Sequence, residues 1–128
     1  MSQEICGTFV TVTTTGSAGS AAGAADSEII NGLLLDIYLD FHASAPNTTD
    51  TTIKYSTSGP DMGNILVVTN SNTDALIAPR QKPVDNANAA ITNAHAMFPV
   101  NGKINVALAQ SDALTGAVVA YIRYLKTR

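Results

Sequence analysis

Hydrophobic and polar residues alternate most regularly in the stretch Ile29–Phe41. From Leu33 onward every second residue is apolar, and Asp36 and Asp40 fall on the other side of this two-residue repeat. Successive side chains of a β-strand point to opposite faces, so the pattern predicts a long strand with one buried face. The expected buried set is Leu33, Leu35, Ile37, Leu39 and Phe41, with Leu34 and Tyr38 on the opposite face.

Several other segments carry a strand pattern and are separated by turn-forming residues. They span residues 3–15, 51–57, 64–70, 75–78, 95–100, 103–110 and 117–126. The unbroken apolar run within 64–70 predicts a strand inside a sheet, and Asn101-Gly102 predicts a hairpin turn. No segment is convincingly helical. We therefore expect an all-β fold, an antiparallel β-sandwich or jelly-roll-like domain of about eight strands.

In two expected strands near the C-terminus, the alternation also predicts which side chains are buried. Within 103–110, the alternation places Ile104, Val106 and Leu108 toward the core. Within 117–126, one face is expected to carry Val118, Ala120, Ile122 and Tyr124, and the other Val119, Tyr121 and Arg123.

The first 27 residues differ in composition from the rest. Residues 3–15 are rich in β-branched residues, whereas Gly16–Ser27 is a low-complexity run without large side chains. We expect residues 1–27 to form a strand-forming N-terminal arm followed by a flexible surface loop, and residues 28–128 to form the β-sandwich domain. The threonine-rich arm has few charges to protect its edge, so a partner chain is expected to cover it.

Only 13% of the residues are charged, about half the usual proportion, which suits a surface that packs against neighbours. Residues 1–79 carry a net charge of 1 − 8 = −7 and residues 80–128 carry 6 − 2 = +4, so the fold is either bipolar or mixes the two halves. The acidic total argues against nucleic-acid binding. No signal peptide or membrane span is recognisable, which predicts synthesis in a cytoplasm without membrane contact.

Candidate chemistry is sparse. Asp36, Asp40 and His42 share one strand face, but four residues separate the two carboxylates by about 13 Å, too far for an acid–base pair. A metal site there needs a ligand from another strand, and His95 joins His42 only through the tertiary fold. The single Cys6 excludes an internal disulfide. We expect no enzyme activity, cofactor, metal or small-molecule substrate, and the low aromatic content, 5%, argues against a sugar-binding face.

Taken together, a series of strand and turn motifs resembles the head decoration, or cement, proteins of tailed bacteriophages. The motifs are Asp-Ile-Tyr-Leu-Asp-Phe within Leu33–Phe41, Thr48–Ile53, Ile65–Asn70 followed by Asn72-Thr73-Asp74, the pair Pro79-Arg80, and Val100–Ala109. They cover residues 28–125, nearly the whole chain beyond the arm and loop.

The resemblance implies a virion structural protein on the outside of a phage head. It would bind the major capsid protein, assemble with itself as a homotrimer and stabilise contacts between capsid subunits. The expected assembly interface consists of Ile5, Phe9, Val10, Val12, Arg80, Lys82 and Phe98. For Arg80, a solvated charge at a strand end is the alternative. Two other functions remain open: a head–tail or tail component, and a β-sandwich module that binds a glycan or receptor.

Overall fold

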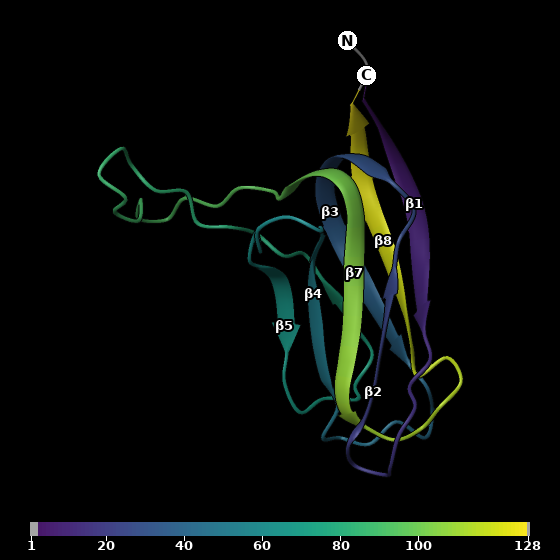
Figure 1. Cartoon of the computed structure of the whole chain (residues 1–128). Coiled ribbons are helices and arrows are strands. Elements are labelled where there is room, and N and C mark those ends of the chain that lie inside the picture. The colour runs from purple at the N-terminus through teal and green to yellow at the C-terminus, as the bar shows by residue number, and fades with distance from the viewer. Residues whose placement is uncertain (1–2, 128) are drawn as a thin grey trace.

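The computed structural model describes residues 3–127, without the side chain of Thr127. These residues form eight β-strands and no helix (Figure 1). The strands are β1 (Gln3–Val12), β2 (Ala21–Asp26), β3 (Ile30–Phe41), β4 (Asp50–Ser56), β5 (Asn64–Val68), β6 (Ala75–Ile77), β7 (Pro99–Ser111) and β8 (Val118–Thr127). All pairings are antiparallel, so the predicted all-β antiparallel fold is confirmed.

The strands follow the order β1-β8-β3-β7-β4-β5, with β6 beside β3 and β2 beside β7. This sheet bends over on itself into two layers. One layer contains β1, β8, β3 and β6, the other contains β2, β7, β4 and β5, and β7 joins them. Strand β8, from the basic half of the chain, lies between β1 and β3 from the acidic half. The acidic and basic halves of the chain are therefore mixed in the fold, which was one of the two arrangements that the charge distribution allowed.

A single hydrophobic core fills the space between the layers. The first layer contributes Val10, Val12, Ile37, Leu39 and Ile122, and the second contributes Ile53, Ile104, Val106 and Leu108. The alternation predicted for the last two long strands is confirmed, because Ile104, Val106, Ala120 and Ile122 are completely buried. Over most of their length the long strands bury alternating side chains, which leaves the intervening side chains on the outside of the sandwich.

Strand β3 contains a β-bulge that changes the expected burial pattern. Leu34 pairs with Tyr124 and Asp36 with Arg123, so Leu35 is an extra residue without its own partner. An extra residue reverses the alternation. Before the bulge Ile30 and Leu34 are buried, and after it Ile37, Leu39 and Phe41 are. The expectation that Leu34 faces away from the core is therefore wrong, and Leu33 and Leu35 are only partly buried.

The predicted hairpin turn at Asn101-Gly102 is also wrong, because both residues lie inside β7. Residues 99–102 pair with β3 in one layer, and residues 103–111 pair with β4 and β2 in the other. Gly102 has a φ of 145°, which favours glycine, and it stands where β7 passes from one layer to the other. The Asn-Gly pair marks this change of sheet.

Part of the predicted surface loop 16–27 is strand β2, which pairs with β7. Alanine and glycine predict strands poorly, but backbone pairing needs no large side chain. At Gly23 a Cβ would lie 2.2 Å from the carbonyl oxygen of Thr13, so only glycine allows this close approach. β1 pairs with β8 along its whole length, and Val10 and Val12 belong to the core. The boundary expected after residue 27 therefore does not separate two structural units.

Strand β5 corrects one more expectation. Its apolar sequence predicts a strand inside a sheet, whereas β5 lies at the edge and pairs only with β4 among the described strands. Ile65 is buried, but Val67 is 53% exposed. An unbroken apolar run is typical of a strand buried on both faces, and here one face is in solvent.

Candidate functional site

A row of exposed apolar side chains crosses the outer face, by which we mean the surface of the β1-β8-β3-β6 layer that faces away from the core. Phe9 on β1 pairs with Tyr121 on β8, Tyr121 with Tyr38 on β3, and Tyr38 with Leu76 on β6. Their exposed fractions are 63%, 45%, 38% and 61%, in that order from Phe9. We call these four residues the apolar row.

The three rings of the apolar row contact one another in sequence. The ring centroids of Phe9 and Tyr121 lie 6.2 Å apart at an angle of 39°, and those of Tyr38 and Tyr121 lie 6.4 Å apart at 42°. These distances are typical of aromatic pairs. Because each ring is supported by its neighbour on the next strand, the row is held in place, but its rings do not lie in one plane.

One ion pair flanks the apolar row. Arg123 Nε donates to Oδ1 of Asp36 at 2.8 Å, and Arg123 Nη2 donates to Oδ2. The hydrogen bonds from Arg123 hold the pKa of the Asp36 carboxyl below its usual value, and the charges of Arg123 and Arg80 act in the same direction against burial. Beyond this pair, Ile5 on β1 is 63% exposed and pairs with Leu125. Apolar side chains thus stand on both sides of a neutralised charge pair.

Arg80 has a defined structural partner at the bulge. Its Nη1 atom donates to the carbonyl oxygen of Leu35 at 2.9 Å and to that of Pro79 at 2.8 Å. Leu35 is the extra residue of β3, which has no partner on β8. Arg80 is exposed and follows the end of β6, and it also binds the backbone of the residue that the bulge leaves without a partner on β8.

Residues 78–98 form a projecting loop that extends away from the two layers (Figure 1). Within the described residues of this loop, strand-like pairing is limited to two isolated bridges, Gln81 with Ala96 and Val84 with Ala90. Val84 is 50% exposed and Ile91 is 44% exposed. The loop holds apolar side chains away from the core of its own chain.

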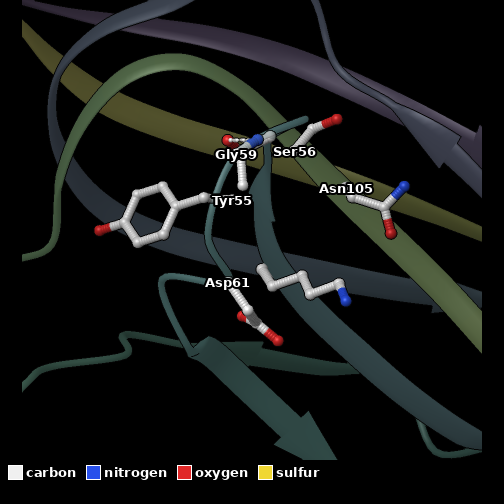
Figure 2. A pocket seen from close by; sticks show the side chains of 7 residues that line it. Tyr55, Ser56, Gly59, Asp61 and Asn105 are labelled. Atoms are coloured by element: carbon white, nitrogen blue, oxygen red, sulfur yellow. Dashed lines mark hydrogen bonds between the residues drawn. The ribbon is translucent and has the colours of Figure 1, made fainter.

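Two hollows lie beside the C-terminal end of β4. The smaller, about 250 Å³, is lined mainly by polar groups, including Lys54, Ser56, Asp61 and Asn105 (Figure 2). Its Asp61 carboxylate accepts a hydrogen bond from the Gly63 N–H at 2.8 Å, as in a local turn. The larger hollow, about 460 Å³, lies at the base of the projecting loop and is lined by Phe98, Met62 and Tyr55 among others.

Neither hollow offers a recognisable reaction centre. The Tyr55 hydroxyl donates to the carbonyl of Pro99 at 2.9 Å, and burial raises its pKa, so it is not an activated base. Beside the smaller hollow, Asn105 donates to Asp26 at 2.9 Å and lowers the pKa of that carboxyl. No described residue of either hollow forms a pair of nucleophile and base.

The comparisons with known proteins give few matches. No family model matches the chain, and no curated protein matches it. Two solved structures, both mutants of the family 29 carbohydrate-binding module CBM29-2, are similar at 12% sequence identity and a TM-score of 0.38. Each alignment covers 94% of this chain and 79% of the other. A similarity at this TM-score supports no inference about this chain.

The residues considered for metal or acid–base chemistry do not form a site. Asp36 is paired with Arg123, and the Nδ1 atom of His42 accepts a hydrogen bond from the Ser44 N–H at 3.0 Å. Among the described residues, no group of three or more His, Cys, Asp or Glu side chains could hold a metal ion. Residues 3–127 also contain no helix long and apolar enough to cross a membrane.

The structure places the expected interface residues in several different environments. Ile5 and Phe9 are exposed on the outer face, and Lys82 is exposed on the projecting loop. Val10 and Val12 are 2% and 0% exposed, so their side chains pack in the core and cannot contact a partner. Phe98 is partly buried against the core and lines the larger hollow, and Arg80 binds the bulge.

Sequence reasoning missed Tyr38, Tyr121 and Leu76 as surface residues of one site. The signal was present, because Tyr38 and Tyr121 fall opposite the core-facing positions of their strands. The low overall aromatic content hid it. Only seven Phe and Tyr residues exist in the chain, but three of them meet in one row. Amino-acid composition alone does not show which side chains from separate strands lie side by side on the surface.

Proposed function

We propose that this protein is a non-catalytic structural subunit that docks onto other protein subunits through its outer face. The apolar row is the observation that carries the proposal. An exposed row of three rings and a leucine, continued by Ile5, is unusual on an isolated surface and is typical of a protein interaction site. Leu76 and Ile5 favour a protein partner, since aliphatic side chains at the ends of the surface gain mainly by packing against other side chains.

The projecting loop supports the same function. Its apolar residues Val84 and Ile91 make little use of the protein's own core, and its root is fixed by Arg80. A loop held out in this way suits contact with a neighbouring subunit. We infer that the assembly is the outer surface of a tailed-phage head, with the major capsid protein as the partner, because the strand and turn motifs resemble head decoration proteins.

An antibody against the purified protein tests this assignment on particles of the phage whose genome encodes the chain. Immunogold label over the head surface is the expected result. Label at the neck or tail would transfer the role to a connecting or tail component. Particles without label, from a lysate in which the protein is detected, would overturn a virion function.

A glycan-binding module is the second candidate, and the adjacent rings favour it. Exposed Tyr and Phe side chains can stack against the apolar faces of sugar rings, and Arg123 and Asp36 offer hydrogen-bonding groups beside them. A glycan array probed with the wild type and with Tyr121→Ala distinguishes the candidates. Sugar binding that Tyr121→Ala abolishes would favour the glycan module, and the absence of any signal would favour a protein partner.

A further inference from the structure

Among the described residues 3–127, no strand pairs with the outer edge of β1. β1 stands at the end of the strand order, and its ten residues all pair with β8 on one side only. No other described strand pairs with it. Figure 1 shows β1 at the margin of its layer. A strand edge of this kind presents unpaired N–H and C=O groups that can pair with another chain.

The other edges of the sandwich are short or interrupted, and β1 is neither. β5 has five residues and a register shift against β4, β6 has three residues, and β2 has six with a shift against β7. β1 pairs with β8 over ten consecutive residues without a shift and contains no proline. Proteins usually shorten, bend or charge their free edges to prevent association. The edge of β1 carries one charge, Glu4 near its N-terminal end, and residues 5–12 are long, regular and uncharged, which points to a partner strand.

We propose that β1 pairs antiparallel with β1 of a second copy of this chain, with Gly7 opposite Gly7. This inference deepens the proposed function by naming one protein partner. Outward side chains must meet outward side chains, so odd-numbered residues face odd-numbered residues across the junction. With Gly7 at the two-fold axis, Phe9 lies opposite Ile5 of the second copy, and Ile5 opposite Phe9.

This register matches the most exposed apolar side chains of the strand. Phe9 and Ile5 are each 63% exposed in the single chain. The pairing brings Phe9 of each copy against Ile5 of the other, so all four side chains become less exposed. An aromatic ring beside a β-branched residue is a favourable cross-strand pair. The two outer faces then form one continuous surface, with the apolar row of one copy continued by Ile5 and Leu125 of the other. A two-fold pair of this kind is self-complementary and closes at a dimer.

The cross-linking test uses cysteine at the two-fold axis. In the double variant Cys6→Ala/Gly7→Cys, a Cβ at position 7 lies 3.7 Å from the Ile122 carbonyl oxygen, an ordinary contact, so the fold should tolerate it. Paired Cα atoms in antiparallel strands are about 4.5–5.5 Å apart, within the range of a disulfide. We expect most of the protein to run as a covalent dimer on a non-reducing gel after mild oxidation.

The matched control is Cys6→Ala/Thr11→Cys, because Thr11 is exposed on the same strand. In the proposed register the two Thr11 residues are about 27 Å apart, too far to cross-link. Equal cross-linking of both variants would show random collision and overturn the proposal. Urea unfolding of each variant confirms that it is folded.

Light scattering on the wild type gives the second readout. A mass of two chains supports the proposal, and a monomer or a trimer at the same concentration overturns it. The outcome is separate from the virion assignment. A dimer that is absent from phage particles would overturn the proposed function and leave the pairing standing, whereas a monomer found on particles would do the reverse.

Discussion

Leu34 and Asp36 lie two residues apart on β3 and face opposite sides of the same sheet. In a regular strand they would face the same side, but Leu35 is inserted between them and has no partner on β8. Leu34 is completely buried in the core, and Asp36 pairs with Arg123 on the outer face. The bulge therefore fixes both the core and the charged group beside the apolar row.

The bulge predicts unequal effects for two neighbouring leucines. Leu34→Ala removes a completely buried side chain and should lower the free energy of unfolding by about 2–5 kcal/mol. Leu35→Ala truncates a partly buried side chain and should cost about 1 kcal/mol or less. Urea unfolding of both variants measures the difference. Equal losses, or a larger loss for Leu35→Ala, would contradict the reversed alternation.

Gly32 is required by the close packing of β3 against β8. A Cβ at this position would lie 2.0 Å from the carbonyl oxygen of Leu125, so the backbone of one strand must move. We expect Gly32→Ala to destabilise the protein by about 1–3 kcal/mol or more. Gly7→Ala is the control, since its Cβ would lie 3.7 Å from the Ile122 carbonyl oxygen, an ordinary van der Waals contact. Thermal unfolding that ranks the two variants equally would count against this packing.

Asp36 should make stability depend on acid pH. Because its pKa is lowered in the folded state, the stabilisation is complete above the unfolded value of about 3.9 and is lost as pH falls through the folded pKa. Asp36→Asn should therefore lower the urea midpoint at neutral pH, and the gap to the wild type should shrink toward about pH 2.5. A gap that stays constant with pH would show that the carboxylate charge is not what stabilises the fold.

Arg80 should connect the projecting loop to the bulge. Arg80→Met keeps the length of the side chain but removes the donors to the carbonyls of Leu35 and Pro79. We expect faster backbone hydrogen exchange around Leu35 and at the root of the loop, and a lower thermal midpoint. Lys82→Met, on the same loop, should leave both unchanged. If Arg80→Met and Lys82→Met behave alike, the hydrogen bonds of Arg80 do not stabilise the contact between the projecting loop and the bulge.

Periodicity predicted most of the strands because their alternation survives in the structure. Along β8 and in the part of β7 from Ile104 to Leu108 no bulge interrupts the buried positions, and Ile104, Val106, Ala120 and Ile122 face the core as expected. In β3 the bulge at Leu35 left no mark in the sequence, because Leu33, Leu34 and Leu35 are equally apolar. The strand was predictable, but its change of face was not.

The candidate site was harder to predict because it depends on strand order. Phe9, Tyr38 and Tyr121 come from three separate strands, and only the pairing of β8 with both β1 and β3 places them in one row. β2 was also hard to predict, because it consists mainly of alanine and glycine and has no hydrophobic pattern, although its backbone pairs with β7. Ile5 and Phe9 could be proposed from β1 alone, which is why these two interface predictions fall on the outer face.

Binding to phage heads, compared between two surface variants, tests the docking role of the outer face most directly. Tyr121→Ser removes the ring at the centre of the apolar row, and Val67→Ser removes a similarly exposed side chain from β5 in the other layer. Urea unfolding should show that both variants are folded, with Tyr121→Ser less stable by about 1–2 kcal/mol because it loses two ring contacts. In co-sedimentation with heads that lack the protein, we expect Tyr121→Ser to bind at least about tenfold more weakly and Val67→Ser to bind like the wild type. If Tyr121→Ser binds heads as tightly as the wild type, the outer face is not the docking surface.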